Sequence, residues 1–83
     1  SNGGLMMEWD NSDNITVNSP NGSSAEVDAE TASIVINLIA LSDLSFALQA
    51  DSNSLSQVVN SFHALREFAL QHPHSTTILK LID

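Results

Sequence analysis

Three histidines and one glutamate toward the C-terminal end are the side chains of this chain best suited to chemistry. His72 and His74 flank Pro73, and His63 stands four residues before Glu67. Imidazole and carboxylate groups together bind transition metals, so these residues are candidate metal ligands. His63 and Glu67 also share a helix face and are a candidate acid–base pair. The simpler alternative is a helix-surface contact and solvated imidazoles near a helix C-terminus, where positive charge is favourable.

The rest of the sequence offers no catalytic or cofactor motif. Cysteine is absent, which removes thiolate catalysis, disulfides and cysteine-ligated zinc. With three glycines there is no phosphate-binding loop, and no serine stands in a Gly-x-Ser-x-Gly pattern. We therefore predict a protein that is not an enzyme and takes no cofactor or metal. A small enzyme or metal binder that uses His63, His72 and His74 is the alternative.

The charge distribution predicts a basic protein as the partner. The chain has ten acidic and two basic residues, a net charge of -8 and a pI near 4.3. No lysine or arginine precedes Arg66, whereas eight carboxylates do: Glu8, Asp10, Asp13, Glu26, Asp28, Glu30, Asp43 and Asp51. Such a field repels nucleic acid and anionic membranes and attracts a basic protein surface. Glu26, Asp28 and Glu30 are the candidate partner-binding residues.

These observations favour a small acidic interaction or regulatory module that docks on a basic protein. A nucleic-acid mimic, which would inhibit a nucleic-acid-binding protein, is an alternative. Only 14% of the residues are charged, however, whereas imitating a phosphate backbone requires dense rows of carboxylates.

The N-terminal part predicts a β-hairpin over about residues 14–27. β-Branched residues alternate with polar ones in Asn14–Asn18, and Ser23–Val27 can form the second strand. Between them, Ser19-Pro20-Asn21-Gly22 has the residues of a tight turn. A strand over Leu5–Trp9, turning through residues 10–13, would make a three-stranded meander. The alternative is a helical domain with a disordered N-terminal arm, since small polar residues bury little apolar area.

The remainder predicts two main helices and a short C-terminal segment, an α+β fold. Asp28 is a good N-cap for a very apolar helix over about residues 29–50, which Ser42-Asp43 could interrupt. Ser54 and Gln57 form a capping-box pattern, so the second helix is expected over about residues 55–71, before Pro73. Residues 75–82 suit either a short helix capped by Ser75 or a strand.

Length and composition predict one small domain over residues 5–83. Residues 1–4, Ser-Asn-Gly-Gly, resemble a leftover of cloning. We expect a cytoplasmic protein, because no segment has the order of a signal peptide and cysteine is absent. The longest apolar stretch, Ile34–Leu41, is too short to span a bilayer, so we expect no membrane partner.

The first helix carries more apolar surface than a hairpin and one amphipathic helix can cover. Each large apolar side chain left exposed forgoes roughly 1.5–3 kcal/mol, and twofold homodimers are the commonest closed assembly. The C-terminal segment, a different protein or a second copy of the chain could supply the cover, and of these we predict a homodimer. The predicted interface residues are Ile36, Ile39, Leu41 and Phe46.

Overall fold

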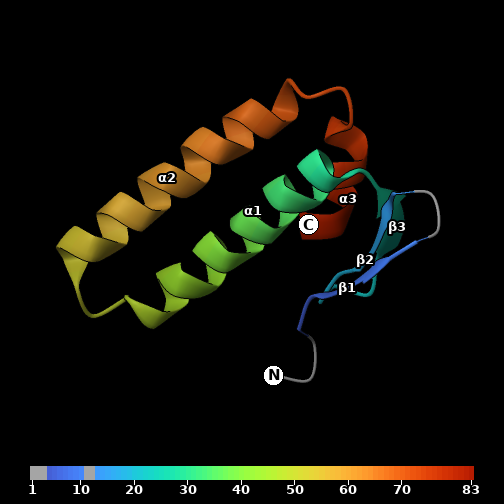
Figure 1. Ribbon diagram of the computed structural model, residues 1–83. Helices are drawn as coiled ribbons and strands as arrows, with labels where there is room; N and C mark the ends of the chain where they lie inside the picture. The colour runs from blue at the N-terminus through green and yellow to red at the C-terminus, as the bar shows by residue number, and fades with distance from the viewer. Residues whose placement is uncertain (1–3, 11–12) are drawn as a thin grey trace.

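A computed structural model describes residues 4–10 and 13–83 and shows an α+β fold. A three-stranded antiparallel sheet at the N-terminal end is followed by two long helices and a short third one (Figure 1). The elements are β1 (Met6–Trp9), β2 (Ile15–Asn18), β3 (Ser24–Val27), α1 (Ala29–Ala47), α2 (Ser52–Leu70) and α3 (Ser75–Ile82). The predicted fold class is confirmed, and the alternative of a disordered N-terminal arm is wrong for the described residues.

The sheet is the predicted meander, with its strands in the order β1-β2-β3. The turn between β2 and β3 closes through two backbone hydrogen bonds between Ser19 and its neighbours Gly22 and Ser23. Gly22 has a φ of 88°, a left-handed conformation that glycine adopts without steric cost. Before β2, the amide of Asp10 donates to the carbonyl of Asn14 over 2.8 Å. Asn11 and Ser12 of the predicted first turn lie outside the described residues.

The helices cover one face of the sheet, over β2 and β3. Ile15, Val17 and Val27 point into the core and are buried. The strand register places Met7 opposite Val17 and Trp9 opposite Ile15, on the same face. These two residues nevertheless remain 45% and 73% exposed. Strand β1 therefore extends past the edge of the helical layer.

Helix α1 begins as predicted, because the carboxylate of Asp28 accepts the amide of Thr31 over 2.8 Å. It runs through Ser42 and Asp43 without a break, and the Ser45 hydroxyl donates to the Ser42 carbonyl over 2.6 Å. The expected interruption at these residues is wrong. The helix ends at Ala47 with Leu48 as C-cap, three residues before the expected end at 50.

Helix α2 begins earlier than the capping-box pattern predicted. The N-cap is Asp51, whose carboxylate accepts both the amide and the hydroxyl of Ser54, at 3.3 and 2.9 Å. Ser54 therefore lies inside the first turn, where it donates to the cap. The prediction of a start at 55 was wrong because two cap-forming residues stand within one helical turn of each other. The helix ends at Leu70, before Pro73.

The C-terminal segment is a helix, α3, which packs against α1 and the sheet. Its N-cap residue is His74, not Ser75. At its other end, the Ser19 hydroxyl donates to the Leu81 carbonyl, and the Asn21 amide donates to the Lys80 carbonyl over 3.1 Å. Helices leave their last carbonyls without partners. The β2–β3 turn supplies partners for two of them and joins the sheet to α3.

Helix α1 passes through the centre of this arrangement. By length and composition alone it is apolar enough to cross a bilayer, a test that the core helix of a soluble protein also passes. Here Val35 and Leu38 of α1 are fully buried, together with Ile78 and Leu81 of α3. Its apolar sequence is thus used, at least in part, to form the protein core.

Candidate functional site

Four carboxylates lie along one path from the sheet to the start of α1. We call them the acidic strip, formed by Asp10, Glu26, Asp28 and Glu30. The last three are exposed, as their role as candidate partner-binding residues requires. Their order follows from the backbone, since β3 leads into α1 through Asp28 alone.

Asp10 and Glu26 lie close together on the outer face of the sheet. Thr16 pairs with Glu26 across the strands, and its hydroxyl donates to the Asp10 carboxylate at 3.0–3.1 Å. Hydrogen bonding to Asp10, and then repulsion between the two charges, raises the pKa of Glu26 above its ordinary value. Two carboxyl groups this close favour a shared proton or a nearby cation.

The other two carboxylates of the strip lie beside the histidines of the α2–α3 turn. The Nε2 atom of His72 lies 3.7 Å from a Glu30 oxygen, and that of His74 lies 3.9 Å from an Asp28 oxygen. Hydrogen bonding from Thr31 lowers the pKa of Asp28, and the charges of the histidines act in the same direction more weakly. Asp28 is therefore both a helix cap and a member of the strip.

The two cationic side chains of the chain make their contacts elsewhere. Arg66 forms an ion pair with Asp83 at 3.8 Å, and the Lys80 ammonium donates to the Ser24 carbonyl over 3.1 Å. Both interactions tie the C-terminal end to the rest of the fold. The acidic strip thus keeps its net negative charge.

The structure does not bring the three candidate metal ligands together, while His63 and Glu67 lie four residues apart on the exposed surface of α2. The ring centroids of His72 and His74 lie 5.6 Å apart. His63 is exposed on α2, and its ring centroid lies 5.8 Å from that of Phe62 in an edge-to-face arrangement. Within residues 4–10 and 13–83, no three histidine or carboxylate side chains are placed to hold a metal ion together. The pair His72 and His74 faces the acidic strip instead, an arrangement that the sequence did not predict.

The predicted dimer residues are covered to different degrees. Ile36, Ile39 and Leu41 are half-buried, and Ile39 packs against the core. Phe46, near the end of α1, is 70% exposed, and Leu44 of the same helix turn is 44% exposed. Within α1, only this end has large apolar side chains that are as exposed as the dimer prediction requires.

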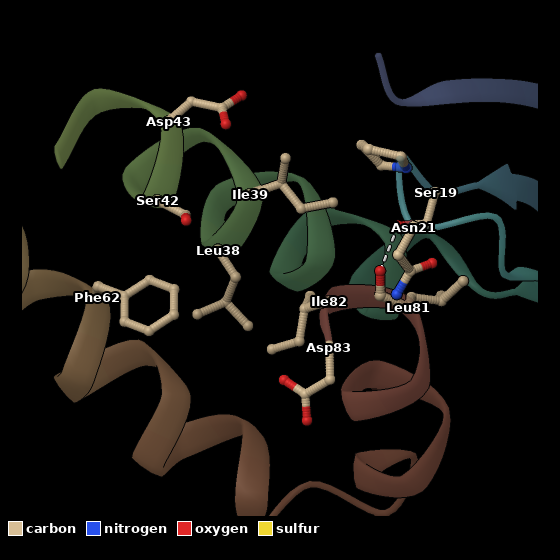
Figure 2. Close-up of a pocket in the computed structure, with 11 residues that line it drawn as sticks. Ser19, Asn21, Leu38, Ile39, Ser42, Asp43, Phe62, Leu81, Ile82 and Asp83 are labelled. Atoms are coloured by element: carbon tan, nitrogen blue, oxygen red, sulfur yellow. Dashed lines mark hydrogen bonds between the residues drawn. The ribbon is translucent and has the colours of Figure 1, made fainter. Parts of the chain in front are cut away.

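A partly open hollow lies where α1, α2, α3 and the β2–β3 turn meet (Figure 2). Its volume is about 190 Å³. Leu38, Ile39 and Phe62 form its apolar wall, while Asp43 and Asp83 stand at its rim. Pockets for drug-sized ligands usually measure about 300–1,000 Å³. The hollow is below that range, and its main lining is the edge of the core.

Comparison with known proteins identifies the family. The sequence model of the antirestriction protein family matches residues 1–83. This chain belongs to the antirestriction protein family. It is 37% identical over 86 residues to "Uncharacterized protein YafX" and 36% identical over 86 residues to "Uncharacterized protein YfjX", both of Escherichia coli strain K12. It is 31% identical over 84 residues to "Antirestriction protein KlcA" of Escherichia coli.

These matches cover the whole of this chain but only part of the relatives. The aligned region is 53% of the first two proteins and 58% of KlcA. The chain therefore spans a little over half the length of the curated relatives it matches. No solved structure matches it significantly.

Sequence reasoning missed one feature of this antirestriction family member. Phe68 is 57% exposed, and its ring centroid lies 6.4 Å from that of His72. The signal was present, because residues four apart on a helix share a face. Phe68 falls outside the apolar stripe of α2, which is formed by Leu55, Val58, Val59, Phe62, Leu65 and Ala69. Phe68 and His72 therefore belong to a surface that is separate from the buried apolar stripe of α2.

Proposed function

We propose that this chain opposes restriction by docking its acidic strip on the basic surface of a restriction-modification enzyme. The observation that carries the proposal is the combination of the antirestriction family match with four neighbouring carboxylates on a chain of net charge -8. Enzymes that act on DNA carry positively charged surfaces that contact the phosphates. The protein is not an enzyme in this proposal and needs no cofactor.

The geometry of the strip supports a cationic partner. The hydrogen bond with Asp10, and then the repulsion between the two carboxylates, raises the pKa of Glu26. A lysine or arginine placed between the two carboxylates would remove this repulsion and favour the charged form of both. Attraction between unlike charges also speeds association, which salt then slows.

The test measures association rates with purified restriction-modification enzymes of Escherichia coli at low and high salt. Glu26→Lys and Glu30→Lys should each slow association and flatten its salt dependence, since both carboxylates are exposed. Asp43→Lys is the matched control, because Asp43 is an exposed carboxylate on α1 outside the strip. An association rate that changes neither with salt nor in the two strip variants would contradict the proposal.

A nucleic-acid mimic is a second candidate, favoured by one specific observation. Glu8 and Glu26 lie opposite Thr16 on its two sides, and Asp10 joins them, so three carboxylates gather on the outer face of the sheet. A mimic must occupy the DNA site of its target. A DNA duplex would then compete with the protein for the enzyme, whereas docking elsewhere would leave DNA binding unchanged.

We also propose a homodimer in the cytoplasm, with the exposed end of α1 in the interface. The exposed Leu44 and Phe46 support this assembly, together with the half-buried Ile36, Ile39 and Leu41 of the same helix. Phe46→Asp should lower the mass measured by light scattering without unfolding the protein, because Phe46 is exposed. A monomer mass for the unsubstituted chain at all concentrations would exclude the dimer.

A further inference from the structure

The C-terminal end of α2 carries an open hollow of about 410 Å³. We call it the aromatic hollow, and it is lined by Glu67, Phe68, Gln71, His72 and Pro73. From its position and chemistry we propose that it binds an arginine side chain of the basic partner. This inference rests on the proposed function and names one contact through which docking would occur.

The first argument is the aromatic wall. Phe68 is 57% exposed, and the His72 ring lies 6.4 Å away at an interplanar angle of 53°. The face of an aromatic ring attracts cations, and the flat guanidinium group also stacks on such rings. An arginine can therefore lie against Phe68 with its charge close to the ring.

The second argument is that one wall is held in place before any ligand arrives. The side chain of His72 is only 8% exposed, and its Nδ1 atom accepts the His74 amide over 3.0 Å. Its Nε2 atom points toward Glu30 at 3.7 Å. A wall that is already ordered loses little entropy when a ligand binds.

The third argument is charge. Glu67 lines the hollow, and the acidic strip continues behind the histidines with Glu30 and Asp28. The last turn of α2 contains no basic residue, so the partial negative charge of the helix C-terminus is not offset there. Pro73 at the rim has no amide proton to repel a cation. Ring, carboxylate and helix end all favour a positive group in the same place.

The planar group of arginine fits this combination better than the ammonium of lysine. Arginine presents several donors in a plane, so one guanidinium can stack on Phe68 and still donate to the Glu67 carboxylate. A lysine ammonium is compact and strongly hydrated, and it has no flat face to stack. We therefore expect a preference for arginine over lysine at equal charge.

Nuclear magnetic resonance titration of the chain with capped hexa-arginine and hexa-lysine peptides tests the inference. Hexa-arginine should shift the amide signals of Glu67 to His74 most and bind more tightly than hexa-lysine. Phe68→Leu should weaken hexa-arginine binding about two- to five-fold, the size of an exposed cation–π contact. Trp9→Leu is the matched control, because Trp9 is also an exposed aromatic residue but lies on β1, outside the aromatic hollow. Glu67→Gln, with Asp43→Asn as its control, tests the carboxylate.

Shifts centred elsewhere, equal affinity for both peptides, or equal effects of Phe68→Leu and Trp9→Leu would overturn the inference. The peptide titration is independent of any restriction enzyme. If the enzymes do not bind the chain but hexa-arginine binds through Phe68, the proposed function is contradicted while the arginine site in the aromatic hollow is supported. If the enzymes bind through the acidic strip but Phe68→Leu does not change the affinity for hexa-arginine, only the arginine site in the aromatic hollow is excluded.

Discussion

The two halves of α1 are similarly apolar in sequence but differ in what they contact. The first half contains all the buried residues of this helix: Thr31, Ala32, Ile34, Val35 and Leu38. The second half ends with Leu44 and Phe46, which are 44% and 70% exposed. In Figure 1 the first half lies between the sheet, α2 and α3, whereas the last turns of α1 extend away from the sheet and α3 alongside α2. Apolar composition therefore predicts a need for cover but not where the cover comes from.

The largest expected effect separates the two halves directly. Leu38→Ala should lower the free energy of unfolding by about 3–5 kcal/mol, because Leu38 is fully buried and its loss leaves a cavity. At a protein concentration where the chain is monomeric, Phe46→Ala should change it little, because most of that side chain is in water in the single chain. Urea denaturation of both variants measures the difference. Equal losses would mean that the second half is as well covered as the first.

Phe62→Ala tests how far the core extends along the helical pair. Phe62 is half-buried and packs against the core cluster from α2. We expect a loss of about 2 kcal/mol, which is below the value for a fully buried phenylalanine. The same urea experiment on Phe68→Ala supplies the exposed control. A melting temperature unchanged by Phe62→Ala would place the core wholly at the sheet end.

The helix caps should make the stability depend on pH. Hydrogen bonds lower the pKa of Asp28 and of Asp51 below their ordinary values. Each carboxylate therefore stabilises the fold above its unfolded pKa, and this contribution is lost as the pH falls through the lower, folded value. The melting temperature should drop in that acidic range.

Asp28→Asn and Asp51→Asn sharpen this comparison, because asparagine still caps a helix but does not titrate. Each should flatten the acid limb of the curve of melting temperature against pH. Asp28→Asn should also lose the attraction to His74, which lies 3.9 Å from the Asp28 carboxylate. An acid limb that neither variant changes would show that other carboxylates control acid unfolding.

The smallest expected effect is a gain of stability. The hydrogen bond with Asp10, and then repulsion between the two charges, raises the pKa of Glu26, and Glu26→Gln removes the repulsion. Because a raised carboxyl pKa means that the charged form is disfavoured in the fold, the variant should melt slightly higher at neutral pH. The difference should vanish at a pH where Glu26 is protonated. Scanning calorimetry at the two pH values checks this.

Local patterns predicted much of the fold. The turn at residues 19–22 was predictable because proline, asparagine and glycine stand where their backbone preferences require. The N-cap Asp28 was predictable for the same reason. The start of α2 was not, because Asp51 and Ser54 are both good caps and only the observed hydrogen bonds decide between them.

The candidate site was only partly predictable. The neighbouring carboxylates Glu26, Asp28 and Glu30 could be identified because they are close in the sequence. The contacts of His72 and His74 with two of them could not, since they depend on how α2 and α3 turn back toward the start of α1. The aromatic hollow required the same long-range information.

The join between the β2–β3 turn and the end of α3 has a consequence for how the chain folds during synthesis. Ser19 and Asn21 bind the carbonyls of Leu81 and Lys80, which the ribosome adds much later. The hairpin can form early from local contacts, but these late residues must emerge before it is locked to the helices. Contacts between segments so distant in the sequence slow folding. Until then the apolar inner face of the hairpin stays open, and this is the interval in which a chaperone would be most useful.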